Sequence, residues 1–63
     1  MLQRQKHELK EQFQDRKKIY ELVCKKNADR AIVMSNIYVN IKYMGNKYSK
    51  ELEDELNQYI AQL

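Results

Sequence analysis

Two side chains in this sequence have the chemistry of a catalytic base or nucleophile. His7 is the one histidine and Cys24 is the one cysteine. His7 lies between Lys6 and Glu8 in a polar stretch, which is typical of a solvated surface histidine. Lys25 follows Cys24, and a neighbouring cation favours a reactive thiol, but no second group is placed as a relay. We therefore expect no catalysis by this chain, no cofactor and no metal site.

Acidic side chains gather near the carboxyl end, where they suggest a cation site. The run contains Glu51, Glu53, Asp54 and Glu55. A calcium-binding EF-hand loop needs a defined ligand order around a central glycine, and this run has neither. Carboxylates in the first turn of a helix also interact favourably with its positive end. We interpret the run as the solvated start of a helix.

Basic side chains concentrate in the first half and raise the alternative of nucleic-acid binding. The net charge is +3, and the chain changes from a basic start to an acidic end. At 100° per residue the basic residues scatter around a helix. The apolar stripe is flanked by Lys6, Lys10 and Lys17. The side of the helix that points away from the stripe carries Lys18 and Lys25. Three carboxylates lie close to the outer basic group: Glu8, Glu11 and Asp15. Nucleic-acid binding is therefore the less favoured hypothesis.

The first half of the chain predicts a long helix over residues 3–27. It is rich in Gln, Lys, Glu, Arg and Leu, which are good helix formers. Its apolar positions form one stripe at helical spacing. These positions are Leu2, Leu9, Phe13, Tyr20 and Val23, with Lys6 and Arg16 inside the stripe.

A second helix is predicted over residues 29–44, where ten of sixteen residues are apolar or aromatic. Asn27 and Asp29 are both able to cap a new helix start. Gly45 is a typical residue just beyond a helix end. Residues 36–43 also alternate between apolar and polar types, so a strand is the rival there. We favour a helix because a lone strand flanked by helices has no partner within the chain.

The last element is predicted as a helix over residues 50–62. Ser49 would cap it, and its apolar residues repeat at spacings of four, three and four. These residues are Leu52, Leu56, Tyr59 and Leu63. With no proline and one glycine in the sequence, we expect one all-α domain over residues 1–63. It would be a small helical bundle or hairpin completed by oligomerisation.

One segment resembles a known family. Ser49, Lys50, Glu51, Leu52 and Glu53 are similar to the Ser-Gln-Glu-Leu-Asp segment of the small aspartyl-phosphate phosphatases that act on sporulation response regulators. Residues 16–19 and 22–23 are similar to the first helix of that family. The resemblance implies a two-helix hairpin and phosphatase activity, with Glu53 in place of the family's acidic residue. It departs from the family at Lys50, at Glu53 and in a longer separation between the helices.

Function is expected to lie in protein–protein contact. A first helix of 25 residues would be about 37 Å long and would overhang a last helix of about 21 Å. Leu2 and Leu9 would then face water in a monomer, so we expect a non-enzymatic adaptor, inhibitor or assembly subunit that binds itself or another helical protein. The expected interface comprises Leu9, Phe13, Arg16, Tyr20, Val23, Leu52, Leu56 and Tyr59. The single cysteine and the lack of an apolar signal core predict a reducing, cytoplasmic location without membrane contact.

Overall fold

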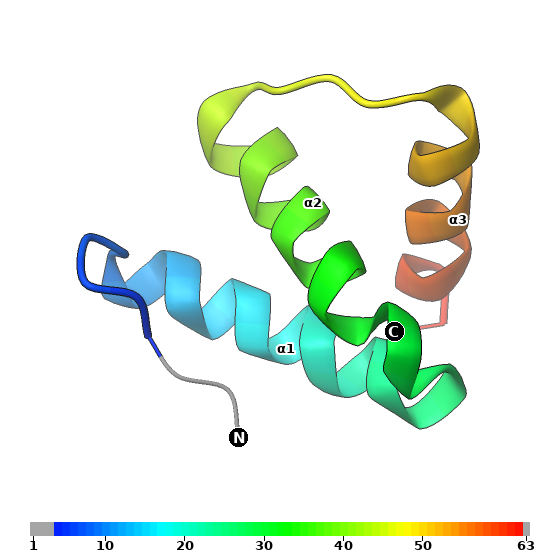
Figure 1. Cartoon of the computed structure of the whole chain (residues 1–63), viewed down its shortest axis with the longest axis horizontal. Helices are drawn as coiled ribbons and strands as arrows, with labels where there is room; N and C mark the ends of the chain where they lie inside the picture. The colour runs from blue at the N-terminus through cyan, green and yellow to red at the C-terminus, as the bar shows by residue number, and fades with distance from the viewer. Residues whose placement is uncertain (1–3, 63) are drawn as a thin grey trace.

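Three α-helices form the part of the chain that the computed structural model describes, residues 4–62. They are α1 (Lys10–Lys26), α2 (Ala31–Met44) and α3 (Lys50–Ile60). A short 3₁₀ turn over Ala28–Arg30 joins α1 to α2. Helix α2 packs extensively along α1, and α3 packs against both with a smaller contact (Figure 1). The expected all-α fold is confirmed, and residues 36–43 are helical.

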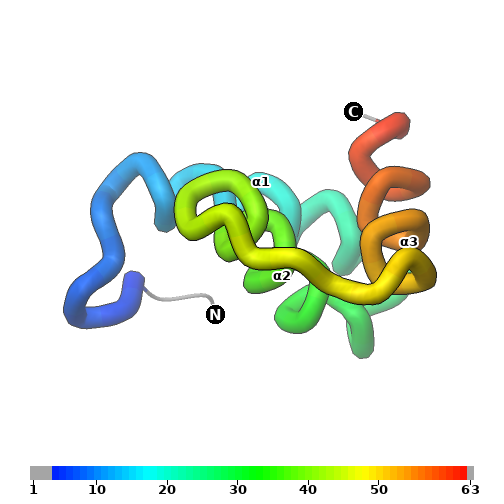
Figure 2. Tube along the Cα trace, turned by 90° about the horizontal axis from the view of Figure 1, so that it is seen from above, coloured from blue at the N-terminus to red at the C-terminus, as the bar shows by residue number. Residues whose placement is uncertain are grey.

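The core lies where the three helices meet. It is built from Ile19 and Val23 of α1, Ala31, Met34 and Ile37 of α2, and Leu56 of α3. Viewed from above, α3 stands nearly upright beside the α1–α2 pair, and residues 45–49 cross from the end of α2 to the start of α3 (Figure 2). Helix α2 therefore has one side on α1 and another on α3, and a third side without a neighbouring helix.

The predicted start of the first helix at residue 3 is wrong, because α1 begins at Lys10. The backbone amide of Leu9 donates to Gln12 Oε1 at 3.2 Å and closes the first turn. Before it, Glu8 N donates to Gln5 O at 3.0 Å in a turn. This turn lets Glu8 reach Arg16, which would lie about 12 Å further along a continuous helix. Leu2 and Leu63 lie outside the described residues.

The predicted helix ends are mostly confirmed. Asn27 stops α1, and its side chain accepts from the backbone amide of Asp29 at 3.2 Å. Helix α2 then starts at Ala31, two residues later than expected, because residues 28–30 form the tighter 3₁₀ turn. Gly45 ends α2 in the left-handed conformation at φ 67°, and Ser49 Oγ accepts from Leu52 N at 3.3 Å to cap α3. Helix α3 ends at Ile60, two residues before the predicted end.

Candidate interaction surfaces

Most of the expected interface residues pack inside a single copy of the chain. Val23 and Leu56 belong to the core, with exposed fractions of 0% and 3%. Tyr20, Leu52 and Tyr59 are half-buried and pack against that core. These five side chains hold α1 and α3 on α2, and they offer little area to a partner while the fold is closed.

Arg16 is also buried, because it pairs with Glu8. Its Nε donates to Glu8 Oε2 at 2.7 Å and its Nη2 donates to Glu8 Oε1 at 2.9 Å. The guanidinium carbon lies 5.7 Å from the ring centroid of half-buried Phe13. The Arg16 hydrogen bond lowers the pKa of Glu8 from its ordinary value. Leu9, with 64% of its surface exposed, is the one residue of the expected interface that stays open.

The third side of α2 carries exposed apolar residues that are not among the expected interface residues. Ile32, Val33 and Met44 are 57%, 40% and 66% exposed. At 100° per residue they fall within about 120° of the helix circumference, together with the half-buried Asn36, Asn40 and Tyr43. Tyr43 bonds to Asp15 of α1, so we call the other five residues the α2 face. The sequence held a signal for it: residues 29–44 are apolar on more sides than two neighbouring helices cover.

One polar side chain of the α2 face, Asn40, is engaged within the fold. Asn40 Nδ2 donates to the Tyr48 hydroxyl at 2.8 Å and ties the loop after α2 to the helix. A hollow of about 250 Å³ lies between this face and the N-terminal turn, lined by residues of both. Asn36 is half-buried at its edge. The α2 face therefore combines apolar side chains with uncharged amides.

Two further ion pairs join the helices at other places. Lys42 Nζ lies 2.7 Å from Asp15 Oδ2, and the Tyr43 hydroxyl donates to the same oxygen. Arg30 forms two hydrogen bonds of 2.9 Å to Glu55. The hydrogen bond from Lys42 lowers the pKa of Asp15, with a smaller contribution from Tyr43. Neither pair includes a residue of the α2 face, which carries no charged side chain.

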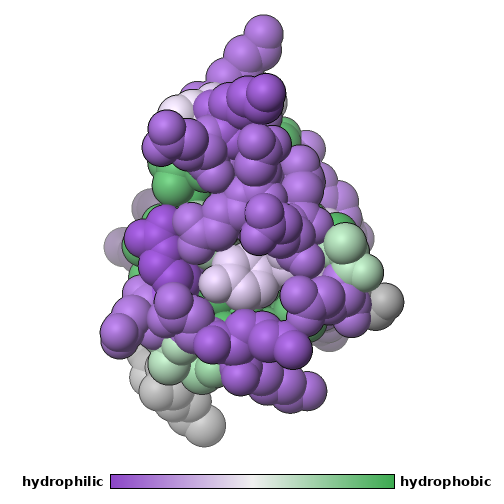
Figure 3. Space-filling view, turned by 90° about the vertical axis from the view of Figure 1, so that its right-hand side faces the viewer, coloured by the Kyte–Doolittle hydropathy of each residue, from purple (hydrophilic) through white to green (hydrophobic). Residues whose placement is uncertain are grey.

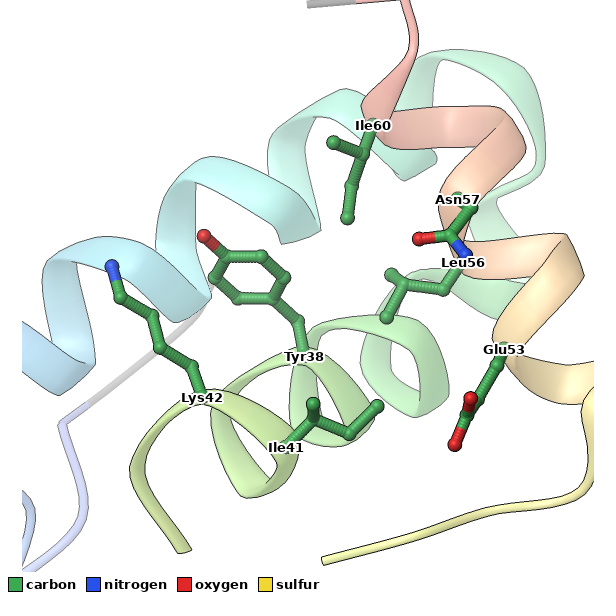
Figure 4. A pocket seen from close by; sticks show the side chains of 7 residues that line it. All are labelled: Tyr38, Ile41, Lys42, Glu53, Leu56, Asn57 and Ile60. Atoms are coloured by element: carbon green, nitrogen blue, oxygen red, sulfur yellow. The ribbon is translucent and has the colours of Figure 1, made fainter. Parts of the chain in front are cut away.

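A groove opens between α2 and α3 on another side of the molecule (Figure 4). It has a volume of about 280 Å³, and its walls are mainly the apolar parts of α2 and α3. Its charged side chains are Lys42, which pairs with Asp15, and Glu53, which accepts a hydrogen bond of 3.1 Å from Tyr48 N. The lining residues are Tyr38, Ile41, Lys42, Glu53, Leu56, Asn57 and Ile60. The groove contains no nucleophile beside a base.

The residues with catalytic chemistry are not brought together. His7 and Cys24 are both exposed, His7 in the N-terminal turn and Cys24 on α1. Within residues 4–62 no group of three or more side chains is placed to hold a metal ion. No helix among these residues has the length and hydropathy to cross a membrane. The molecule seen from the α3 side is largely hydrophilic (Figure 3).

Comparisons of the chain with protein-family models, with curated proteins and with solved structures find no match. The resemblance of residues 49–53 to the small phosphatases therefore has no family model behind it. In the structure, Ser49 caps α3 and Glu53 hydrogen-bonds to the preceding loop.

Proposed function

We propose that this chain is a small, non-enzymatic interaction module that binds a second copy of itself through the α2 face. The observation that carries the proposal is the exposure of Ile32, Val33 and Met44 on one side of the central helix. Leaving large apolar side chains in water costs free energy, and burial recovers about 25 cal/mol per Å² of apolar surface. Grouped exposed apolar residues are characteristic of interaction sites.

Charge favours a second copy at this face over the other helix surfaces. The outer side of α1 is basic, and α3 carries Glu51, Glu53 and Asp54. Two copies that met through either surface would place like charges together. The α2 face carries no charged side chain, so two copies with net charge +3 meet there without local repulsion.

Asn36 of the α2 face suits a symmetric contact. A two-fold axis brings the same patch of both copies together. The Asn amide both donates and accepts hydrogen bonds, so Asn36 is able to pair with itself across the axis. Buried Asn residues in helix–helix contacts fix register and partner number. The module would serve as an adaptor, inhibitor or assembly subunit, in a reducing compartment that keeps Cys24 a free thiol.

Sedimentation equilibrium tests the proposal. At about 0.1 mM the average mass measured for the wild-type protein is expected to exceed the monomer mass of 7.7 kDa. Helix α2 is only about 21 Å long, so its contact is smaller than a standard interface and the dimer dissociates on dilution. Ile32→Asp should give a monomer, because it places a charge in the contact. An acidic residue at this helix start keeps the fold stable.

Leu9→Asp is the matched control, because Leu9 is equally apolar and exposed but lies outside the α2 face. It should leave the mass unchanged. A wild-type chain that stays monomeric at this concentration would refute self-association. Equal loss of dimer in both variants would refute the position of the interface.

A further inference from the structure

The outer side of α1 forms a predominantly basic surface. Lys10, Lys17, Lys18 and Lys25 are all exposed. Their positions fall within about 100° of the helix circumference, and from Lys10 to Lys25 they extend over about 22 Å. Gln14 lies among them, and so does the exposed carboxylate of Glu21. We call the four lysines and Gln14 the lysine face.

Two of the carboxylates that we expected near these lysines from the sequence lie away from them in the structure. Glu8 turns back to the buried side of α1 and pairs with Arg16. Asp15 bonds to α2 through Lys42 and Tyr43. Among the described residues, none of the four lysines of the lysine face makes an ion pair. The acidic groups that stay exposed on α1 are Glu11, at the edge of the lysine face, and Glu21, within it, so one carboxylate lies among the four lysines. The surface is therefore more positive than the sequence alone indicates.

An aromatic ring lies at the edge of this charge. A shallow hollow of about 510 Å³ is lined by Arg4, Lys10, Phe13, Gln14 and Lys17. The Phe13 ring has the Arg16 guanidinium near it at 5.7 Å and is half-buried, so part of it is open to this hollow. Farther along α1, a second hollow of about 450 Å³ is lined by Gln14, Lys17, Lys18, Glu21, Leu22 and Lys25.

We propose that the lysine face binds single-stranded nucleic acid, with lysines on the phosphates and one base stacked at Phe13. Proteins that bind single strands without sequence preference combine a positive surface along the backbone with aromatic side chains under the bases. A row of lysines about 22 Å long beside one aromatic ring has this composition. The binding uses α1 and is independent of the α2 face.

An anionic membrane is the less suitable partner. Membrane-surface helices place large apolar residues next to their basic side, and these insert between the lipids. The exposed large apolar residues of the described chain are Leu9, Ile32, Val33 and Met44. None of them belongs to the lysine face, and three of them lie on α2. The lysine face thus offers charge without an inserting group.

Fluorescence anisotropy with a labelled oligodeoxythymidine of about 16 nucleotides tests the proposal. Four lysine contacts predict a slope of log affinity against log salt of about −3 for a single strand. The double variant Lys17→Gln, Lys25→Gln should bind at least about tenfold more weakly at low salt and reduce the slope by about 1.4. The control, Lys47→Gln with Lys50→Gln, removes the same charge from exposed positions outside α1 and should retain the slope.

Phe13→Leu separates stacking from charge. It should weaken binding about tenfold while the salt slope stays constant, because a base loses its aromatic partner and no phosphate contact is lost. Circular dichroism confirms that each variant is folded. No binding of the oligonucleotide at low salt, or an equal loss in the control, would overturn the proposal. Tighter binding to a DNA duplex or to phosphatidylserine vesicles than to the single strand would also overturn it.

Discussion

The guanidinium of Arg16 and the carboxylate of Glu8 form two hydrogen bonds, of 2.7 and 2.9 Å, with 6% of each side chain exposed. This pair fastens the N-terminal turn to α1. It also explains how an arginine is accommodated on the side of α1 that faces the fold, because a buried charge is tolerated when it is paired and hydrogen-bonded.

Removal of Glu8 should destabilise the fold strongly. Glu8→Ala leaves the Arg16 charge buried without its carboxylate, and loss of one partner of a buried pair costs about 3 kcal/mol. Small domains have only about 5–15 kcal/mol of stability, so urea denaturation should show a clearly lower midpoint. Glu21→Ala is the matched control, because Glu21 is exposed on α1 and makes no ion pair within residues 4–62. Equal effects of the two variants would contradict the role of the pair.

Acid should destabilise the protein through the three carboxylates that form ion pairs within residues 4–62. Hydrogen bonds from Arg16 and Arg30 lower the pKa of Glu8 and of Glu55 below 4.5, and Lys42 lowers that of Asp15 below 3.8. The unfolded chain therefore binds more protons in this range. The stabilisation is complete above about pH 5 and is lost as the pH falls through the lowered values.

The free energy of unfolding, measured by urea titration from pH 6 to pH 2, gives this dependence. The slope below pH 4.5 should be smaller in Glu8→Ala, since one of the shifted groups is absent. A free energy of unfolding that rises as the pH falls would contradict this prediction.

The helix boundaries show which structural features are predictable from the sequence alone. Asn27, Gly45 and Ser49 are local signals, because each acts on its own backbone neighbours, and all three end or begin helices as expected. The sequence does not predict the start of α1, because this start depends on the Glu8–Arg16 pair. A contact eight residues apart is incompatible with a continuous helix, and helix propensity alone does not report it.

The surfaces were harder to predict than the fold. Helical spacing identifies apolar positions, but it does not say which of them the chain itself covers. Val23 and Leu56 are covered, whereas Ile32 and Met44 are not. The difference depends on where α1 and α3 lie around α2, which is a tertiary property.

Gly45 should resist substitution because of its backbone conformation. Its φ of 67° is left-handed, and a Cβ added there would meet no atom within 4 Å. The cost of Gly45→Ala is therefore backbone strain alone, about 1 kcal/mol. Gly45→Asn should cost less, because Asn visits this conformation more readily. Thermal unfolding compares the two variants, and a more stable Gly45→Ala protein would show that the α2 end is misplaced.

Oxidative cross-linking at Asn36 tests the central claim, that two copies meet through the α2 face. Asn36 lies near the middle of this face, so two α2 helices that cross on a two-fold axis bring both copies of residue 36 together. With Cys24→Ser as background, Asn36→Cys should form a covalent dimer rapidly under mild oxidation. Gln58→Cys, at an exposed position on α3, should stay monomeric. Monomer alone from Asn36→Cys, or equal cross-linking at both positions, would contradict the account.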